Sequence, residues 1–416
     1  MKMDYSHRKV SKKIRITDGQ GNPLANKEVS VKQTNHKFLF GCGAFEFLPY
    51  VMIQDEKWKI PGGAPFASKE QLQQITDSWL EIFNYGTLPF YWGRFEPEEG
   101  KPQTEAIMAT AKYLTDRNVK VKGHPLCWHT VCADWLMKYD NKTIMEKQLA
   151  RIDREVGGFK GIIDMWDVIN EVVIMPVFDK YDNAVTRLCK EHGRVGLVKA
   201  VFDRAYENNP KATLLLNDFN TSVKYEELIQ DCLDAGVPIS AIGIQSHQHQ
   251  GYWGREKLED ILSRFERFGL PIHFTENTLI SGEIMPAYIE DLNDWQVDEW
   301  PSTPEGEERQ TREIEEMYRV LFAHPLVEAI TTWDFKDGAW LKAPSGFLRL
   351  DNSRKPSFDM LKKLVKEEWW TNDKLVTDAD GYITVSAFKG EYEIASDGKA
   401  AAVELVDDSD LTIALS

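Results

Sequence analysis

Two glutamates in this sequence stand where a pair of carboxyl groups could do chemistry. Glu171 ends the segment WDVINE and Glu276 lies in the later segment TEN, and each follows a run of apolar residues. Cleavage of a glycosidic bond needs two carboxyl groups around a sugar, one to protonate the departing oxygen and one to stabilise or capture the cationic sugar. A single glutamate is most often a solvated rim residue, but two in matching positions favour a catalytic pair.

Further polar and aromatic side chains occupy the same kind of position, at the end of an apolar run. They are His124 and Trp128 in GHPLCWH, Asn170 in WDVINE, Phe219 in NDFN, Gln245 and His247 in GIQSH, and Trp333 in TTWDF. Histidines and amides can hold a carboxylate by hydrogen bonds, and exposed aromatic faces suit sugar rings. Core packing is the ordinary alternative for each one alone, so the prediction rests on the group.

Eight short apolar runs alternate with stretches of helical spacing, such as EQLQQITDSWLEIF and REKLEDILSRFERFG. The runs are 38–44, 83–87, 119–128, 163–171, 212–219, 239–247, 271–276 and 329–335. Each is apolar enough to be buried on both faces, which is typical of parallel strands. Eight β/α units predict an α/β fold, a closed (β/α)8 TIM barrel, whose active face is formed by the carboxyl ends of the strands. Glu171 and Glu276, on the fourth and seventh runs, would then face each other across the mouth.

The two ends of the chain have a different pattern. Residues 14–17 and 29–33 form a strand-turn-strand pattern around DGQGNP, and short strands are expected again after Trp370, in TDADGYITVSAFKGEYEIAS and AAVELVDD. Because a lone hairpin is marginally stable, we predict that both ends pack together as one small β unit beside the barrel. The predicted parts are 1–37 (N-terminal β segment), 38–369 (barrel) and 370–416 (C-terminal β segment).

One connection is unusually long for a barrel. Residues 281–312, after the seventh strand, are rich in acidic side chains and contain Trp295 and Trp300. Long connections tend to be functional or disordered, and this one would lie on the active rim. A lid, a subunit contact, a platform for the leaving group and a solvated insertion all remain open.

Composition sets limits on function. The 416 residues carry 50 Lys+Arg and 66 Asp+Glu, a formal charge of −16, which argues against nucleic-acid and anionic-membrane partners. The five cysteines show no metal-site spacing, and we expect them to be free thiols and the protein to need no cofactor. No apolar run is long enough for a membrane span, and no apolar region follows the basic start. We expect a cytoplasmic protein, or a secreted one if a leader was removed. The sequence does not predict the oligomeric state.

The motifs together resemble those of the family 10 glycoside hydrolases, best known as endo-β-1,4-xylanases. WDVINE and TEN, with GHPLCWH, NDFN, GIQSH and TTWDF in the same order, cover roughly residues 40–365. The resemblance implies a retaining double displacement on a β-glycan such as xylan, with Glu171 as acid/base and Glu276 as nucleophile. It also implies that Asn170 donates to the sugar 2-hydroxyl and that His247 holds the nucleophile, with Gln245 nearby. The predicted substrate-binding residues are His124, Trp128, Gln245, Trp333, Trp340, Tyr91 and Phe219.

Several positions depart from the family pattern. The family usually carries Glu-Asn-x-x-Lys-Trp after the second strand, to grip the sugars on the non-reducing side, and here those three polar positions are Thr87, Leu88 and Tyr91. Val131 stands where a glutamine is usual, and Asn277-Thr278 stands where Leu-Asp is usual. We therefore expect a rebuilt non-reducing subsite and a preference for a decorated or different β-glycan over linear xylan.

Three alternatives stay open at this point. His124, His129 and His247-Gln248-His249 could suggest a metal hydrolase, although that leaves the carboxylates unexplained. The altered loop after the second strand could belong to a catalytically silent glycan-binding barrel. A related two-glutamate barrel could instead act on β-glucan or mannan. Endo versus exo action is also open.

Overall fold

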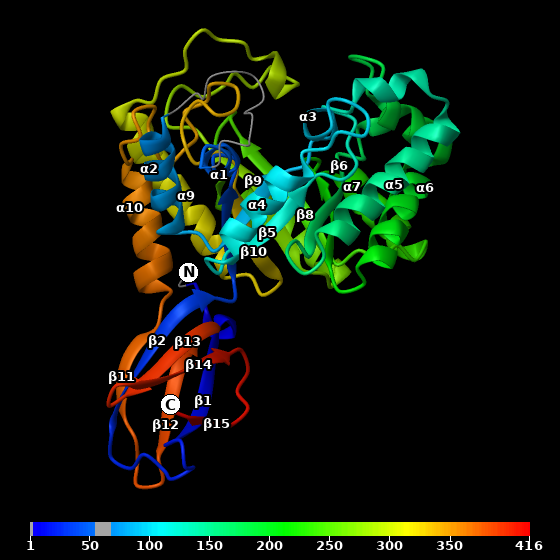
Figure 1. Cartoon of the computed structure of the whole chain (residues 1–416). Coiled ribbons are helices and arrows are strands. Elements are labelled where there is room, and N and C mark those ends of the chain that lie inside the picture. Colours follow the sequence, from blue (N-terminus) through cyan, green and yellow to red (C-terminus); the bar gives the residue numbers. More distant parts are fainter. Residues whose placement is uncertain (1–2, 55–67) are drawn as a thin grey trace.

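A closed barrel of eight parallel strands forms the larger part of the chain. The computed structural model describes residues 3–54 and 68–416. The barrel strands are β3 (Leu39–Gly43), β4 (Tyr85–Pro89), β5 (Lys120–His124), β6 (Met165–Asn170), β7 (Thr213–Asp218), β8 (Ala241–Gln248), β9 (Ile272–Leu279) and β10 (Val327–Thr332). They pair in chain order, and β10 closes the barrel on β3 (Figure 1). The predicted (β/α)8 fold is confirmed, with one strand in each of the eight apolar runs.

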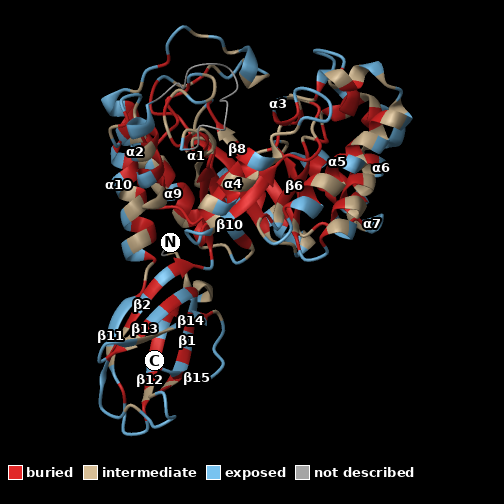
Figure 2. Cartoon of the chain, viewed as in Figure 1, coloured by how far each residue is buried: buried red, intermediate tan, exposed pale blue. Residues whose placement is uncertain are grey.

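Helices surround this barrel. They are α1 (Phe47–Met52), α2 (Lys69–Leu80), α3 (Trp92–Phe95), α4 (Thr104–Thr115), α5 (Asn141–Gly158), α6 (Ala184–Asn208), α7 (Val223–Asp234), α8 (Gly254–Phe265), α9 (Pro304–Phe322) and α10 (Pro356–Lys363). Several begin at side-chain caps; at α2, Ser68 and Gln71 form a reciprocal capping box. Each longer helix turns an apolar stripe toward the strands, so burial is concentrated at the barrel wall (Figure 2).

The barrel strands are buried on both sides, as their apolar composition predicts. Every residue of β9 is buried, as are all residues of β3. The barrel interior is so tightly packed that only glycine fits at position 123. A Cβ atom there would lie 2.1 Å from the Trp166 ring. Neighbouring strands β5 and β6 pair at these two residues, so the indole fills space that only glycine leaves open.

The terminal strands form two small sheets beside the barrel. One sheet has the order β12 (Tyr382–Phe388), β1 (Lys9–Thr17), β15 (Leu411–Ala414); the other has the order β11 (Asn372–Val376), β2 (Glu28–His36), β13 (Gly390–Ser396), β14 (Lys399–Leu405). Both contribute to one apolar core, and both mix strands from the two chain ends (Figure 1, bottom). The predicted packing of the N- and C-terminal segments against each other is therefore present. The predicted boundaries at residues 37 and 370 stay predictions.

The long connection after β9 is shorter than the sequence pattern suggested. It ends at residue 303 rather than 312, because α9 begins at Pro304. Thr303 caps this helix by accepting a hydrogen bond from the Gly306 amide at 3.0 Å, and proline suits the first helical position. The first turns of α9 are polar, so the spacing of apolar residues did not predict that the helix begins there.

Two further findings concern the whole described chain. None of the helices in residues 3–54 and 68–416 is both long and apolar enough to cross a bilayer. All five cysteines lie in this part of the chain, and none of them forms a disulfide.

Candidate active site

Glu171 and Glu276 lie at the carboxyl end of the barrel, on strands that are three positions apart around its wall. Glu171 directly follows β6, and Glu276 lies within β9. Both residues have a left-handed backbone, with φ of 58° and 62°. This conformation is uncommon for residues other than glycine and tends to occur at functional sites, where it aims a side chain.

Three side chains surround the Glu276 carboxylate. Asn217 Nδ2 donates to Glu276 Oε1 at 2.8 Å, and His247 Nε2 lies 3.1 Å from Oε2. His124 Nδ1 is 3.9 Å from Oε1. Burial favours the protonated acid, but attraction to His124 and the hydrogen bond from His247 outweigh it, so the pKa of Glu276 lies below its ordinary value. Glu276 is therefore ionised at neutral pH, as a nucleophile must be.

Glu171 has the opposite electrostatic character. Trp128 Nε1 donates to Glu171 Oε2 at 2.8 Å, while Asn170 Nδ2 and Gln245 Nε2 each lie 3.2 Å from Oε1. Burial raises the pKa of Glu171, and the negative charge of Glu276 raises it further, to about 8, although the bond from Trp128 acts against this. Glu171 is thus protonated at neutral pH, as a general acid must be.

A chain of amides connects the two carboxyl groups. Asn217 Nδ2, which serves Glu276, also donates to Asn170 Oδ1 at 2.7 Å. Asn170 Oδ1 accepts a second bond from Gln245 at 3.1 Å, and its amide nitrogen faces Glu171. Thr275 fixes the amide of Asn217 by donating to its oxygen at 2.7 Å. Each amide therefore has a defined orientation, and the two acids are held in one rigid network.

A buried ion pair inside the barrel supports His124. Asp167 Oδ2 lies 2.7 Å from both Lys122 Nζ and His124 Nδ1, and all three residues are almost fully buried. Burial raises the pKa of Asp167, but the charge of Lys122 and the bond from His124 reverse the effect and lower it. An ionised Asp167 accepts the Nδ1 hydrogen of His124, so this ring is fixed beside Glu276.

Aromatic rings form the walls around these groups. The Trp333 ring packs edge-on against His124 at 5.2 Å, and Trp340 lies 4.7 Å from His247, measured between ring centroids. Tyr91 lies between His124 and Trp128, at 5.6 and 5.8 Å. Trp333 is buried, while Trp128 and Trp340 stay partly exposed toward the mouth. Such apolar faces suit the carbon faces of a pyranose.

The structure brings together most of the predicted site residues. Contacts connect Tyr91, His124, Trp128, Asn170, Glu171, Gln245, His247, Glu276, Trp333 and Trp340 into one group. Gln245 lies beside the acid Glu171 rather than beside the nucleophile. Phe219 follows β7, is 46 % exposed, and shares none of the described ring or hydrogen-bond contacts of this group.

Sequence reasoning missed the roles of Asn217, Asp167 and Lys122. Asn217 stands in the NDFN segment and is fully buried, and Lys122 is fully buried two residues before His124. The available signal was polarity inside an apolar run: a lysine or an asparagine in the middle of a buried strand requires a partner. Which partner it has follows from the barrel register and not from spacing along the chain.

Two of the positions that depart from the family pattern are closed to solvent, and two are partly exposed. Thr87 and Leu88 are fully buried in β4, whereas Tyr91, beside the Trp128 ring, and Val131 are partly exposed. Val131 has a φ of 51°, which is an outlier for a β-branched residue, and it borders a cavity of about 280 Å³ that Arg94 and Tyr181 also line. These four positions therefore form a different surface from the one that Glu, Asn, Lys and Gln would give.

Asn277 and Thr278 have structural partners. Ser246 donates to the Asn277 side-chain oxygen, and the backbone N–H of Gln248 donates to Thr278 Oγ1 at 3.1 Å. These bonds connect β9 to β8 next to Glu276. Among the residues that the structure describes, no three His, Cys, Asp or Glu side chains are grouped in a way that could hold a metal ion.

Comparison with known proteins agrees with this geometry. The sequence pattern of glycosyl hydrolase family 10 matches residues 82–362. An endo-1,4-beta-xylanase/feruloyl esterase of Xylanibacter ruminicola is 24% identical over 66% of this chain and 40% of its own length. The anti-sigma-I factor RsgI6 of Acetivibrio thermocellus is 23% identical over 93% of this chain and 45% of its own length. The chain thus spans less than half the length of these two relatives.

Solved structures share the fold. The family 10 glycoside hydrolase structure from Paenibacillus barcinonensis superposes with a TM-score of 0.63 at 21% identity, covering 79% of this chain and 95% of the other. At this level of identity the likeness supports the barrel architecture.

Proposed function

Since the chain belongs to glycosyl hydrolase family 10, we propose that it hydrolyses β-1,4-xylosidic bonds of xylan or xylo-oligosaccharides with retention of anomeric configuration. Glu276 is the nucleophile and Glu171 the acid/base. The observation that carries the two roles is the opposite protonation of the acids, with the pKa of Glu171 raised to about 8 and that of Glu276 lowered. Retention is taken from the family resemblance. No cofactor takes part in this reaction.

In the first step the two acids act together. A carboxylate oxygen of Glu276 attacks the anomeric carbon, the bond from that carbon to the bridging oxygen breaks, and the Glu171 proton passes to the departing oxygen. The shortened glycan leaves as an alcohol, and the sugar stays as an ester on Glu276. His247 and Asn217 hold the attacking carboxylate in place throughout.

In the second step Glu171 works as a base. Esterification removes the charge of Glu276, which is one cause of the raised pKa of Glu171, so the proton affinity of Glu171 falls. Glu171 accepts a proton from water while the water oxygen attacks the anomeric carbon, and Glu276 leaves as a carboxylate. The amide of Asn170, between the two acids, is placed to donate to the sugar 2-hydroxyl.

The substrate assignment has separate support. The Xylanibacter ruminicola relative is named a xylanase, and the rings of Trp333, Trp340 and Trp128 suit a pyranose. Because Tyr91 and Val131 replace charged and amide groups, we propose that a branched xylo-oligosaccharide is a better substrate than a linear one. A β-glucan or mannan backbone is the alternative that the same loop leaves open.

An activity panel tests the proposal. The wild type should release aryl from an aryl β-xyloside and cleave xylan oligosaccharides faster than glucan or mannan oligosaccharides. Glu276→Ala should abolish this release, and azide should restore it with inversion, because azide fills the space of the missing carboxylate. Wild-type protein that binds xylan oligosaccharides without cleaving them would instead support a silent glycan-binding barrel. That alternative stays open because one relative, RsgI6, is named an anti-sigma-I factor and not a hydrolase.

A further inference from the structure

The connection between β9 and α9, residues 280–303, is a folded segment, here called the strap. Its side chains make a small apolar core of their own around Ile280, Met285 and Trp300, with Leu341 and Ala343 from the loop after β10. Trp300 Nε1 donates to the Glu283 carbonyl at 2.8 Å, which ties the two ends of the strap together. The strap thus has internal packing of the kind that keeps a loop in one shape.

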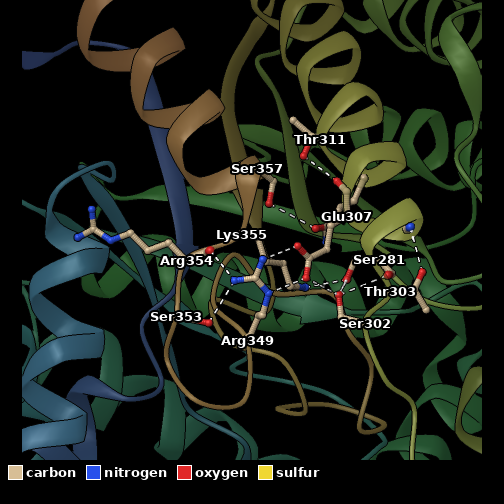
Figure 3. Close-up of polar contacts among 12 residues, drawn as sticks. Ser281, Ser302, Thr303, Glu307, Thr311, Arg349, Ser353, Arg354, Lys355 and Ser357 are labelled. Atoms are coloured by element: carbon tan, nitrogen blue, oxygen red, sulfur yellow. Dashed lines mark hydrogen bonds and ion pairs between the residues drawn. The ribbon is translucent and has the colours of Figure 1, made fainter.

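Polar contacts fix the base of the strap (Figure 3). Lys355 Nζ donates to Ser281 Oγ at 2.7 Å. The same nitrogen pairs with Asp337 at 2.6 Å, deep in the protein. Arg349 grips Glu307, near the start of α9, with two hydrogen bonds of 2.6 and 2.7 Å. The base therefore cannot move without breaking a buried ion pair.

The strap runs outward along the rim of the barrel. The Met285 amide donates to the His249 carbonyl at 2.9 Å, just beyond β8. Gln250 Nε2 then donates to the carbonyls of Pro286 and Ile289, at 3.0 and 2.7 Å. These bonds attach the middle of the strap to the loop after β8. In Figure 1 the strap is the yellow-green loop above the barrel, and its far end extends toward the segment that precedes α6.

The far end of the strap is held by one lysine from another loop. Lys180, in the loop after β6, lies 2.6 Å from Asp291 and 2.8 Å from Asp294. The strap therefore starts at β9, follows β8 and reaches the loop after β6. Its two attachments therefore lie on either side of the end of β7, and β7 and β8 are the strands between Glu171 and Glu276 on that side of the barrel.

This part of the rim faces the leaving group. The positions that correspond to the family's non-reducing subsites lie at the end of β4 and in the loops after β4 and β5. In a ring of eight strands β4 lies opposite β8, so a glycan whose non-reducing part lies over β4 and β5 extends its reducing part over β7 and β8. The strap is attached just beyond β8 and at the loop after β6, and therefore lies on that side of the cleft.

We infer that the strap, latched by Lys180 to Asp291 and Asp294, is a barrier that limits the leaving-group side of the cleft to a short fragment. The inference rests on the proposed function and goes beyond it, because it assigns end-directed rather than internal cleavage. The three latch side chains are 43, 34 and 62 % exposed. Surface ion pairs of this kind are weak, so the latch, unlike the base, opens at little cost.

Bond choice in a labelled oligosaccharide tests the barrier. Xylohexaose with a fluorophore on its reducing end is the long substrate, and an aryl β-xylobioside, whose leaving group is a single ring, is the short one. The variants are Lys180→Ala and the double variant Asp291→Asn with Asp294→Asn. The side chain of Asp291 accepts a hydrogen bond of 2.9 Å from the backbone N–H of Asn293. Asparagine at position 291 can accept the same bond, so the variant removes the charge and keeps the turn. The matched control is Lys199→Ala, which removes an ion pair of 2.9 Å with similar exposure from the outer face of α6.

The wild type should release mainly a labelled mono- or disaccharide. Both latch variants should cleave at bonds further from the label. They should also raise the ratio of kcat/KM on the long substrate to kcat/KM on the short substrate about fivefold, which corresponds to the free energy of a surface ion pair. Lys199→Ala should change neither the cleavage position nor this ratio. Internal cleavage by the wild type would overturn the barrier, and so would latch variants with the same cleavage position and kcat/KM ratio as Lys199→Ala. In either case, turnover of the aryl xylobioside by the wild type would still support the proposed function. Failure of the wild type to hydrolyse the aryl xylobioside would overturn both.

Discussion

The side-chain amide of Asn217, on β7, donates a 2.8 Å hydrogen bond to Oε1 of Glu276, on β9. The same nitrogen donates to Asn170 beside Glu171, so one amide group contacts both halves of the catalytic arrangement. A hydrogen bond to an ionised carboxylate favours the ionised form. We therefore expect Asn217 to position Glu276, and we expect its loss to change the protonation of that acid as well as its geometry.

Replacing Asn217 with alanine should lower kcat/KM on an aryl β-xyloside about 10- to 100-fold, since a hydrogen bond to a charged group contributes about 1.5–3 kcal/mol. The acid limb of the pH profile should also move upward, because Glu276 loses a donor. Asn220→Ala, in the turn after the same strand, is the control. An unchanged acid limb would show that Asn217 has a purely structural role.

The pH profile of kcat/KM should be bell-shaped, with its alkaline limb near pH 8. Activity needs Glu276 ionised and Glu171 protonated, so it falls below the lowered pKa of Glu276 and above the pKa of Glu171 at about 8. Trp128→Phe removes a bond that lowers the pKa of Glu171 and should move the alkaline limb upward. A limb that moves downward in this variant would contradict the assignment.

The raised pKa of Glu171 should lower the free energy of unfolding at alkaline pH. Below pH 4.5 the acid is protonated in both the folded and the unfolded chain. Between pH 4.5 and about 8 only the unfolded chain releases the proton, so the free energy of unfolding declines across this window. Glu171→Gln removes this decline. In urea denaturation, the free energy of unfolding of the variant relative to that of the wild type should therefore increase by about 4 kcal/mol from pH 4 to pH 8.5. An equal gain at both pH values would contradict the raised pKa; Glu105→Gln, on the exposed face of α4, is the control.

Linear xylotetraose should be a poor substrate compared with a branched xylo-oligosaccharide. Thr87 and Leu88 are buried, and Tyr91 offers an aromatic face where the family has a lysine. Loss of one charge-assisted bond alone corresponds to about 10-fold or more in kcat/KM. Tyr91→Lys should narrow the gap while leaving aryl β-xyloside turnover within a few fold. Linear xylotetraose turned over as fast as the branched substrate would exclude a rebuilt subsite.

The sequence predicted the barrel because its strands are apolar on both faces and its helices carry apolar stripes, two patterns that are local. It did not predict the edges of the small sheets, since β15 pairs in parallel with β1 across almost the whole chain. It also placed the end of the strap too late, because Thr303 and Pro304 start α9 ten residues before its first buried aliphatic residue, Ile314.

The meeting of Glu171 and Glu276 at one end of the barrel was predictable for a similar reason. Glu171 and Glu276 end apolar runs, and a closed parallel barrel brings such ends to one face. The amide chain through Asn217 and the partnership of Lys122 with Asp167 depend on strand register, which spacing along the chain does not determine. Lys180 carries no motif, and its role follows only from where the strap folds.

Trapping of the glycosyl ester tests the central claim most directly. A 2-deoxy-2-fluoro-β-xyloside with a good leaving group slows the second step more than the first, so the ester on a retaining nucleophile accumulates and can be mapped by peptide mass spectrometry. We expect one fluoroxylosyl group per chain, on the peptide that contains Glu276, and none in Glu276→Ala. A label on any other residue, or turnover with inversion and no label, would contradict the roles assigned to Glu171 and Glu276.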